Sequence, residues 1–543
     1  MLKEPLFQND IFEHIIKYMT FYLGYEYWFL IFCGVLLFLY LCYKFLMYRN
    51  DVSYAGNFPT EEYPFSFAQK SQVWCLAFLI LCVVYNIVAI FSQEMSFFSN
   101  YDTRGSVILI FERGVVPAWG VWERFCPLAF WDTNILYAVT HHFGVINVYL
   151  SIQSLIIVWL LNYFLRFMPV CKRFLCVGLI MASPVIFSIS SVIFSERLLL
   201  MYIIGSLICF QKYGQYSQKK YFLWFGILLT NFALYCKELS VLFYFGIFFY
   251  YAVSHVWNGR IVPKSFLHPL QTARKYPFEV LLILSIVCFF SLYLFHMGGV
   301  MDSSYALARQ MSLFETFKRY YTEIAVSIVV VFFMFKNLFS QQKYPLIEGM
   351  AFGSVMITIF VIFILRIGQF VLSMACLPYY LTVSHVIGLV YVFSYFKNKY
   401  FYVLVCFFLA LNSIVRNIGI QQNYDGTYYR EVAEFIMSGK EGAKVNVFIS
   451  KHSDFGNWSI RAWRLPFVYY WPNANVDFFF SGADLNTIDF FEEDRVFYKK
   501  TPDVGDYFVI RKAKYYSQDM YEISGMEADK VFENKMFEVY LIK

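Results

Sequence analysis

Long apolar runs fill most of the chain up to Arg416, and short polar connectors separate them. The first two runs cover residues 28–46 and 73–91, close to the ~20 residues that a helix needs to cross a bilayer core. The pattern therefore predicts an α-helical polytopic membrane protein with about twelve transmembrane helices. The remaining expected spans are 145–165, 174–194, 198–211, 221–235, 239–256, 277–296, 322–338, 346–365, 370–394 and 400–415.

The pattern changes after Arg416, where the long apolar runs stop and shorter, strand-like segments alternate with turn residues. We therefore divide the chain into a membrane domain over residues 1–416 and a small soluble C-terminal domain, α/β or α+β, over residues 417–543. The strand-like segments read KVNVFIS, PFVYYW, VDFFFSG, DYFVIRK and FEVYLIK.

The composition agrees with a chain that has lipid as its main solvent. Hydrophobic residues make up 59% of the 543 residues, aromatic residues 22% and charged residues only 15%. The net charge of +6 is small and its basic residues are scattered, so the sequence gives no support to nucleic-acid binding. The first residues, MLKEPLFQNDIFEHIIKYM, lack the features of a cleaved signal peptide, and we expect them to lie on the membrane surface.

Neither the cysteines nor the histidines indicate a firm metal site or disulfide framework. The 12 cysteines fall largely in apolar runs without a metal-type spacing such as CxxC, so we expect them to be small packing residues. His141 and His142 adjoin an expected interface and could bind a divalent metal together with Asp132. A structural role for this histidine pair is the favoured interpretation, and no cofactor is assigned.

The charges of the connectors predict the orientation of the chain. Connectors that contain Lys44, Arg166 and Lys219 belong to a basic set that should stay in the cytoplasm, whereas the alternate connectors carry most of the carboxylates. This gives external loops at about 94–140 and 297–321, and an external C-terminal segment.

Two charged pairs interrupt apolar stretches on the predicted external side. Glu196 and Arg197 form one pair, and Lys237 and Glu238 form the other. The flanking apolar runs are short, which would recess these charges below the interface, where a charge costs roughly 2.5 to 3.5 kcal/mol. Adjacent residues on a helix point apart, so neither pair can neutralise itself well. A functional role and a tight external turn both remain open.

The order of these elements resembles the GT-C superfamily of integral-membrane glycosyltransferases. Asp102 follows an early span and matches the carboxylate in their first external loop, FSERL (194–198) matches a Ser-Glu turn, and CKELS (236–240) matches a Lys-Glu turn. WERFCPLAFWDTN, from Trp122, is similar to a Gly-Arg-and-Pro stretch in the same loop, and the Arg366 segment resembles a stretch before the last helices. The resemblance covers roughly residues 73–416.

The resemblance implies transfer of a hexose from a polyprenyl phosphate to a hydroxyl at the external face. Such a reaction needs a base for the hydroxyl proton and positive charge for the departing phosphate. Asp102, as general base, and Glu196 are the expected catalytic residues. Donor phosphate binding is expected from Arg104, Lys237, Arg309 and Arg366, and an acceptor-binding or supporting role from Glu112, Arg124, Asp132 and Glu238.

We expect a bacterial inner membrane, an undecaprenyl-phosphate hexose as donor, and a surface glycan such as O-antigen as acceptor, with a supporting role for the C-terminal domain on the periplasmic side. Two other functions stay open. A polysaccharide polymerase or ligase that uses a lipid diphosphate should have a large late external loop rich in Arg and His, whereas residues 297–321 contain no His. A transporter should have mid-span ionisable residues, whereas here the charges gather toward one face.

Overall fold

A computed structural model gives the fold. It describes residues 26–48, 62–91, 126–140, 142–189, 195–216, 218–257, 269–297, 313–338, 345–361, 378–395, 399–422, 425–440, 443–450, 465–467, 470–471, 473, 475–481, 496–499, 503–512 and 527–543.

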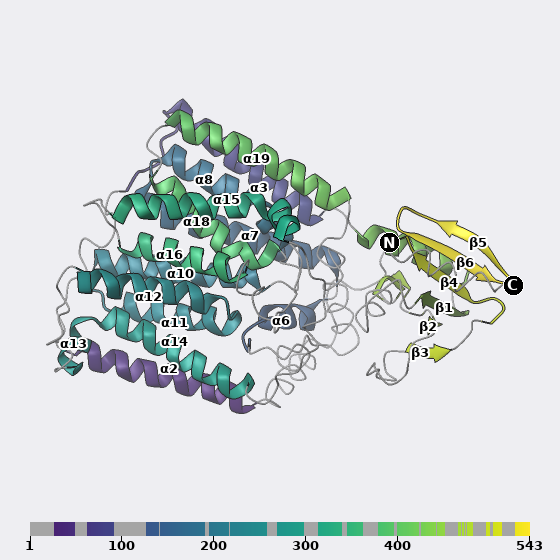
Figure 1. Cartoon of the computed structure of the whole chain (residues 1–543), viewed down its shortest axis with the longest axis horizontal. Helices are drawn as coiled ribbons and strands as arrows, with labels where there is room; N and C mark the ends of the chain where they lie inside the picture. Colours follow the sequence, from purple (N-terminus) through teal and green to yellow (C-terminus); the bar gives the residue numbers. More distant parts are fainter. Residues whose placement is uncertain are drawn as a thin grey trace.

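Helices packed side by side form the larger part of the molecule, and a small sheet lies beyond one end of this bundle (Figure 1). A helix overlaps each of the segments that the hydrophobic pattern predicts as spans. The bundle helices are α2 (Glu26–Met47), α3 (Lys70–Phe91), α7 (Phe143–Phe164), α8 (Val170–Ala182), α10 (Glu196–Gln215), α11 (Tyr221–Cys236), α12 (Ser240–Trp257), α14 (Pro277–Met297), α15 (Leu313–Leu338), α16 (Pro345–Ile359), α18 (Thr382–Tyr395) and α19 (Lys399–Gln422).

Four of the described helices are long and apolar enough to cross a membrane, which supports a polytopic membrane protein. They cover Leu30–Met47, Lys70–Phe91, Gly144–Phe167 and Pro277–Phe295. Other apolar helices, such as Tyr221–Cys236, are shorter than this, so the number of about twelve spans stays a prediction.

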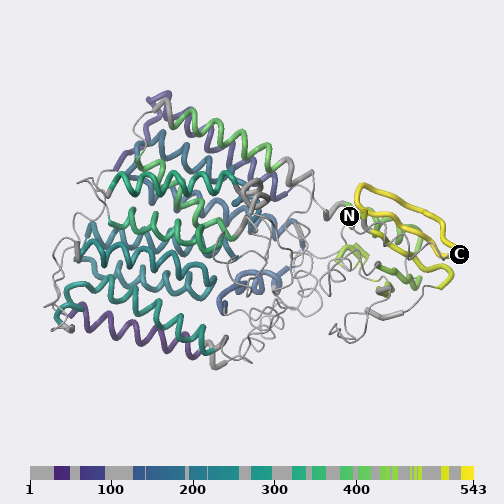
Figure 2. Tube along the Cα trace, viewed as in Figure 1, coloured from purple at the N-terminus to yellow at the C-terminus, as the bar shows by residue number. Residues whose placement is uncertain are grey.

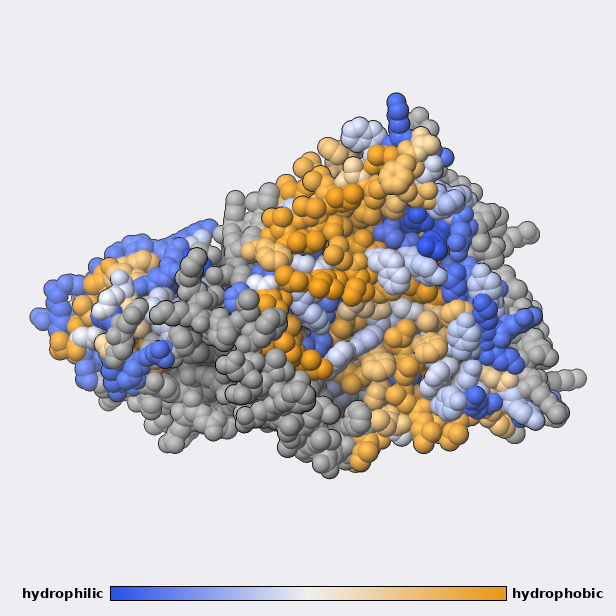
Figure 3. Space-filling view, turned by 180° about the vertical axis from the view of Figure 1, so that it is seen from behind, coloured by the Kyte–Doolittle hydropathy of each residue, from blue (hydrophilic) through white to orange (hydrophobic). Residues whose placement is uncertain are grey.

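The outer surface of the bundle is strongly apolar. Trp74 and Phe295 expose 76% and 78% of their surface, and hydrophobic residues spread over the middle of the bundle in Figure 3. Hydrophilic residues gather at the end of the bundle away from the sheet in the same view. A surface of this kind matches hydrocarbon rather than water.

Helices α12 and α16 approach each other closely because glycines lie between them. A Cβ added to Gly246 would lie 2.4 Å from the Cα of Gly353, and one added to Gly353 would lie 2.5 Å from the carbonyl oxygen of Phe243. Gly349 and Gly353 form the GMAFG segment, a small-xxx-small spacing that lets two helices in lipid pack backbone to backbone.

Gly353→Ala is therefore expected to destabilise the bundle by ~1–3 kcal/mol, because the added methyl group must push two backbones apart. The matched control is Gly34→Ala on α2, where an added Cβ meets nothing within 4 Å. Thermal unfolding in detergent should show a lower melting temperature for Gly353→Ala only. Equal melting temperatures for the two variants would contradict this packing.

The expected span 174–194 is broken into α8 and a short helix, α9 (Pro184–Ser188). Pro184 has no backbone N–H, so it interrupts the helical hydrogen bonds. The freed carbonyls find other donors: Ser183 Oγ donates to Ile180 O at 2.6 Å, and Asn417 Nδ2 donates to Ala182 O at 3.0 Å. By contrast α10, expected at 198–211, runs from Glu196 to Gln215, and its 20 residues span ~30 Å.

The C-terminal region forms a six-stranded mixed sheet of order β3-β2-β1-β4-β6-β5, and the strands nearest the C-terminus are yellow in Figure 2. Strands β3, β2, β1 and β4 are parallel, while β6 is antiparallel to both β4 and β5. The strands are β1 (Lys444–Ser450), β2 (Asn475–Ser481), β3 (Val496–Lys499), β4 (Tyr507–Arg511), β5 (Ala528–Glu533) and β6 (Phe537–Ile542).

Helix α20 (Asp425–Met437) supplies the core on one side of the sheet, where Tyr429, Val432 and Ile436 are buried with Val447 and Val509. This agrees with the expected small domain of strands and helices. One strand prediction is wrong: within PFVYYW the described residues 466, 467 and 470 are helical. The aromatic residues there favoured a strand, but Phe467 packs on one face of the sheet and is buried in the same core as Val447 and Val509.

Candidate functional site

The two charged turns of the sequence meet at one end of the bundle. Helices α10 and α11 are antiparallel neighbours joined by the short connector 216–220, so the start of α10 and the end of α11 must lie together at the opposite end. Glu196 is the first residue of α10, and Lys237 directly follows α11. The short helix α6 (Trp131–Val139) also lies at this end of the bundle, which faces the sheet (Figure 1).

Lys237 and Glu196 form a buried ion pair. Lys237 Nζ lies 3.0 Å from Glu196 Oε1, and the two side chains expose 13% and 3% of their surface. The ammonium also lies 5.3 Å from the ring centre of Tyr380, in the short helix η6 (Pro378–Leu381), which favours a cation–π interaction. The N-terminal position of Glu196 on α10 places its carboxylate where the helix dipole stabilises negative charge.

The segment around α6 is attached to these same turns. Cys126 Sγ donates to Glu238 Oε2 at 2.9 Å, and the backbone N–H of Leu128 donates to Tyr235 O at 3.0 Å. Trp131 Nε1 donates to the hydroxyl of Tyr202, on α10, at 3.1 Å. The part of the predicted first external loop that the structure describes is therefore fixed against α10 and α11.

Asp132 lies in a buried hydrogen-bond network beside the ion pair. Its Oδ2 atom accepts from the Tyr149 hydroxyl at 2.8 Å and from Gln153 Nε2 at 3.0 Å. Gln153 Oε1 in turn accepts from Arg197 Nε at 2.8 Å, and Arg197 also donates to the carbonyl of Ile189. This network joins α6, α7 and α10.

Of the histidine pair 141 and 142, the structure describes His142, which has a local role. His142 is the N-cap residue of α7, and its Nδ1 atom accepts from the backbone N–H of Gly144 at 3.1 Å. Asp132 is already bound by Tyr149 and Gln153. Among the described residues, no group of three or more His, Cys, Asp or Glu side chains could hold a metal ion.

The structure thus brings together Glu196, Lys237, Glu238 and Asp132 from the residues that the sequence singles out. No disulfide joins the cysteines that it describes. The remaining expected residues lie outside the described part of the chain: Asp102, Arg104, Glu112, Arg124, His141, Arg309 and Arg366.

Sequence reasoning missed Cys126, Tyr149, Gln153 and Tyr380. A signal did exist for Gln153, which is a polar residue inside the apolar run YLSIQSLIIVW and is 3% exposed. A polar side chain at such a position needs partners inside the bundle.

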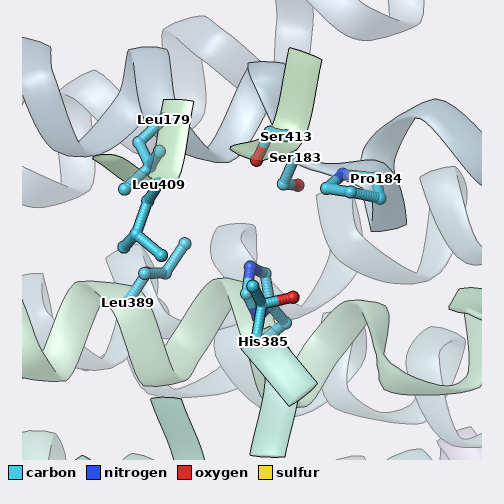
Figure 4. A pocket seen from close by; sticks show the side chains of 8 residues that line it. Leu179, Ser183, Pro184, His385, Leu389, Leu409 and Ser413 are labelled. Carbon is cyan, nitrogen blue, oxygen red and sulfur yellow. The ribbon is translucent and has the colours of Figure 1, made fainter. Parts of the chain in front are cut away.

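A second buried polar cluster joins α15, α18 and α19. Arg416 Nη1 lies 3.1 Å from Glu323 Oε1, and Thr322 Oγ1 donates to Glu323 Oε2 at 2.7 Å. Beside them, Ser183, Thr322, His385 and Ser413 line a small cavity, and the His385 side chain points toward Ser183 and Ser413 (Figure 4). The centre of a water molecule can occupy about 10 Å³ of this cavity, so the cavity has room for about one water molecule.

Arg416→Ala is expected to cost ~3–5 kcal/mol of stability, because it leaves the 1%-exposed carboxylate of Glu323 without its cation. The control is Arg430→Ala, which breaks an exposed i,i+4 pair with Glu434 and should cost only ~0.3–0.5 kcal/mol. Chemical denaturation of the two variants in detergent measures the difference. A loss for Arg416→Ala as small as that of the control would show that Glu323 does not depend on this pair.

Comparisons with known proteins leave the family open. No protein-family model matches the chain, and no curated protein matches it. Among solved structures, it is similar to the Archaeoglobus fulgidus oligosaccharyltransferase tethered with an acceptor peptide containing the NVT sequon, with 10% identity and a TM-score of 0.41. The match covers 72% of this chain and 63% of that one, so the chain spans less than two thirds of that protein's length. A likeness this remote assigns no activity to the chain.

Proposed function

We propose that the chain is a GT-C type membrane glycosyltransferase, which moves a hexose from a polyprenyl phosphate to a hydroxyl group. One observation carries the proposal: the Ser-Glu and Lys-Glu turns, 41 positions apart between Glu196 and Lys237, meet as a buried ion pair at one end of the bundle. The Glu196 carboxylate, the Lys237 ammonium and the segment around α6 lie together at the end of the apolar helices. This position suits a donor that keeps its tail in lipid and its phosphate at the interface.

Lys237 is the residue that we assign to the donor phosphate. In the reaction the acceptor oxygen forms a bond to the anomeric carbon, the bond from that carbon to the phosphate oxygen breaks, and the phosphate leaves with the electron pair. An ammonium in a site with little water stabilises this developing charge much more strongly than it would in bulk water. Glu196 holds the ammonium in place before the donor arrives, and we count it in the catalytic site.

Asp102 is the proposed general base that takes the proton of the acceptor hydroxyl. Arg104, Arg309 and Arg366 are proposed as further phosphate ligands, and Glu112 and Arg124 as residues that contact or support the acceptor. Asp132 and Glu238 support the site, since their carboxylates accept hydrogen bonds from Gln153 and Cys126. The C-terminal domain, from about residue 417, is proposed to support the reaction on the same side of the membrane.

The proposed donor is an undecaprenyl-phosphate hexose in a bacterial inner membrane. The proposed acceptor is a surface glycan such as O-antigen, with the site and the C-terminal domain on the periplasmic side. Mass spectrometry of the surface polysaccharide from cells with and without the gene tests this function. We expect a glycan repeat that is one hexose heavier when the gene is present. Identical surface glycans in the two strains would contradict the proposal.

A further inference from the structure

Gln153 occupies the centre of the buried network next to the Glu196–Lys237 pair. Its amide nitrogen donates to Asp132 Oδ2 at 3.0 Å and to the Tyr149 hydroxyl at 2.7 Å. Its amide oxygen accepts from Arg197 Nε at 2.8 Å. Both ends of the amide are engaged, so only one orientation of the Gln153 side chain satisfies all three partners.

The three elements that Gln153 joins are the ones that form the candidate site. Asp132 lies in the first turn of α6, Gln153 in α7, and Arg197 in α10, directly after Glu196. Asp132, Gln153 and Arg197 expose 9%, 3% and 3% of their surface, so little water is present to replace a lost hydrogen bond.

The neutral amide also separates two opposite charges. Arg197 donates to the oxygen of Gln153 and to the carbonyl of Ile189, and both of these acceptors are neutral. Arg197 and Glu196 are consecutive in α10 and point apart, so Arg197 binds the network while Glu196 pairs with Lys237.

We infer that Gln153 is a positioning residue, which fixes α6 and the start of α10 relative to each other beside the candidate site. This inference rests on the proposed function for its effect on sugar transfer. The network itself is independent of that function.

The inference is tested by variants that exchange the carboxylate of Asp132 and the amide of Gln153. In Gln153→Glu, two carboxylates face each other at positions 132 and 153, and like charges at this distance repel strongly. In the double variant Asp132→Asn/Gln153→Glu, the carboxylate and the amide have exchanged places. The carboxylate now at position 153 can then accept from the amide now at position 132, from Tyr149 and from Arg197, and the net charge of the network equals that of the wild type. The control Gln215→Glu makes the same change at the other end of α10, where Lys212 can still donate to the new carboxylate.

Two quantities are measured for each variant: the melting temperature in detergent, and kcat for transfer from an undecaprenyl-phosphate hexose, per amount of monodisperse protein and well below the melting temperature. We expect Gln153→Glu to have a lower melting temperature than the wild type. Its kcat should be at least ~10-fold lower, because a small displacement of the groups in a site lowers the catalytic rate by about this factor or more. The double variant should recover most of the melting temperature, and its kcat should rise clearly above that of Gln153→Glu.

Two results would overturn the inference. One is a double variant that melts no higher than Gln153→Glu, which would mean that the network does not exist as described. The other is a kcat for Gln153→Glu within twofold of wild type, which would make Gln153 purely structural. Absence of transfer by the wild-type protein with every donor would instead refute the proposed function, and the melting temperatures would still test the network.

Discussion

Substitution of Lys237 with alanine is expected to lower sugar transfer by ~10²- to 10³-fold, which is the typical effect of removing one group that stabilises charge in a transition state. The same change also leaves Glu196 buried without its cation, which should lower the yield of folded protein. Transfer is therefore measured at matched amounts of monodisperse protein.

The double variant Glu196→Gln/Lys237→Met separates these two effects. It removes both buried charges together, and so it should recover the yield and melting temperature that Lys237→Ala loses. If Lys237 binds the donor phosphate, transfer stays as low as in Lys237→Ala. Recovery of transfer to near wild-type rates would show that the pair is structural only.

Asp102→Asn is expected to reduce turnover by ~10²- to 10⁴-fold, because asparagine keeps the size of the side chain but cannot accept the proton of the acceptor hydroxyl. Expression and donor binding should remain. The rate of transfer at saturating donor is the measurement, with Glu112→Gln compared at the same protein level. A rate for Asp102→Asn within about twofold of wild type would remove Asp102 from the mechanism and direct attention to Glu112 or Asp132.

Much of the helical architecture could be predicted because hydrophobic runs depend on local sequence. The short connector between α10 and α11 also explains why Glu196 and Lys237, far apart in sequence, meet in space. The ends of the helices were less predictable. Helix α10 extends past Gln211 because Lys212 can lie along the bundle surface, over the ring of Tyr163 at 5.5 Å.

Contacts between distant helices could not be predicted from one sequence. Nothing in the spacing of Asp132, Gln153 and Arg197 shows that α6 folds back onto α7, or that Tyr380 lies over Lys237. The helical part of PFVYYW was missed for a related reason. Its aromatic residues suit both a strand and a helix that covers a sheet, and only the tertiary packing of Phe467 decides between them.

A transfer assay with the purified full-length chain tests the central claim most directly. The probes are undecaprenyl phosphates that carry different radiolabelled hexoses, and the acceptor is surface polysaccharide from a strain that lacks the gene. We predict that label moves from the lipid to the polysaccharide with the wild-type chain, and that Glu196→Gln/Lys237→Met, folded to the same extent, transfers at least ~100-fold more slowly. Transfer at equal rates by the two proteins, or none by the wild-type chain with any of the donors, would contradict the account.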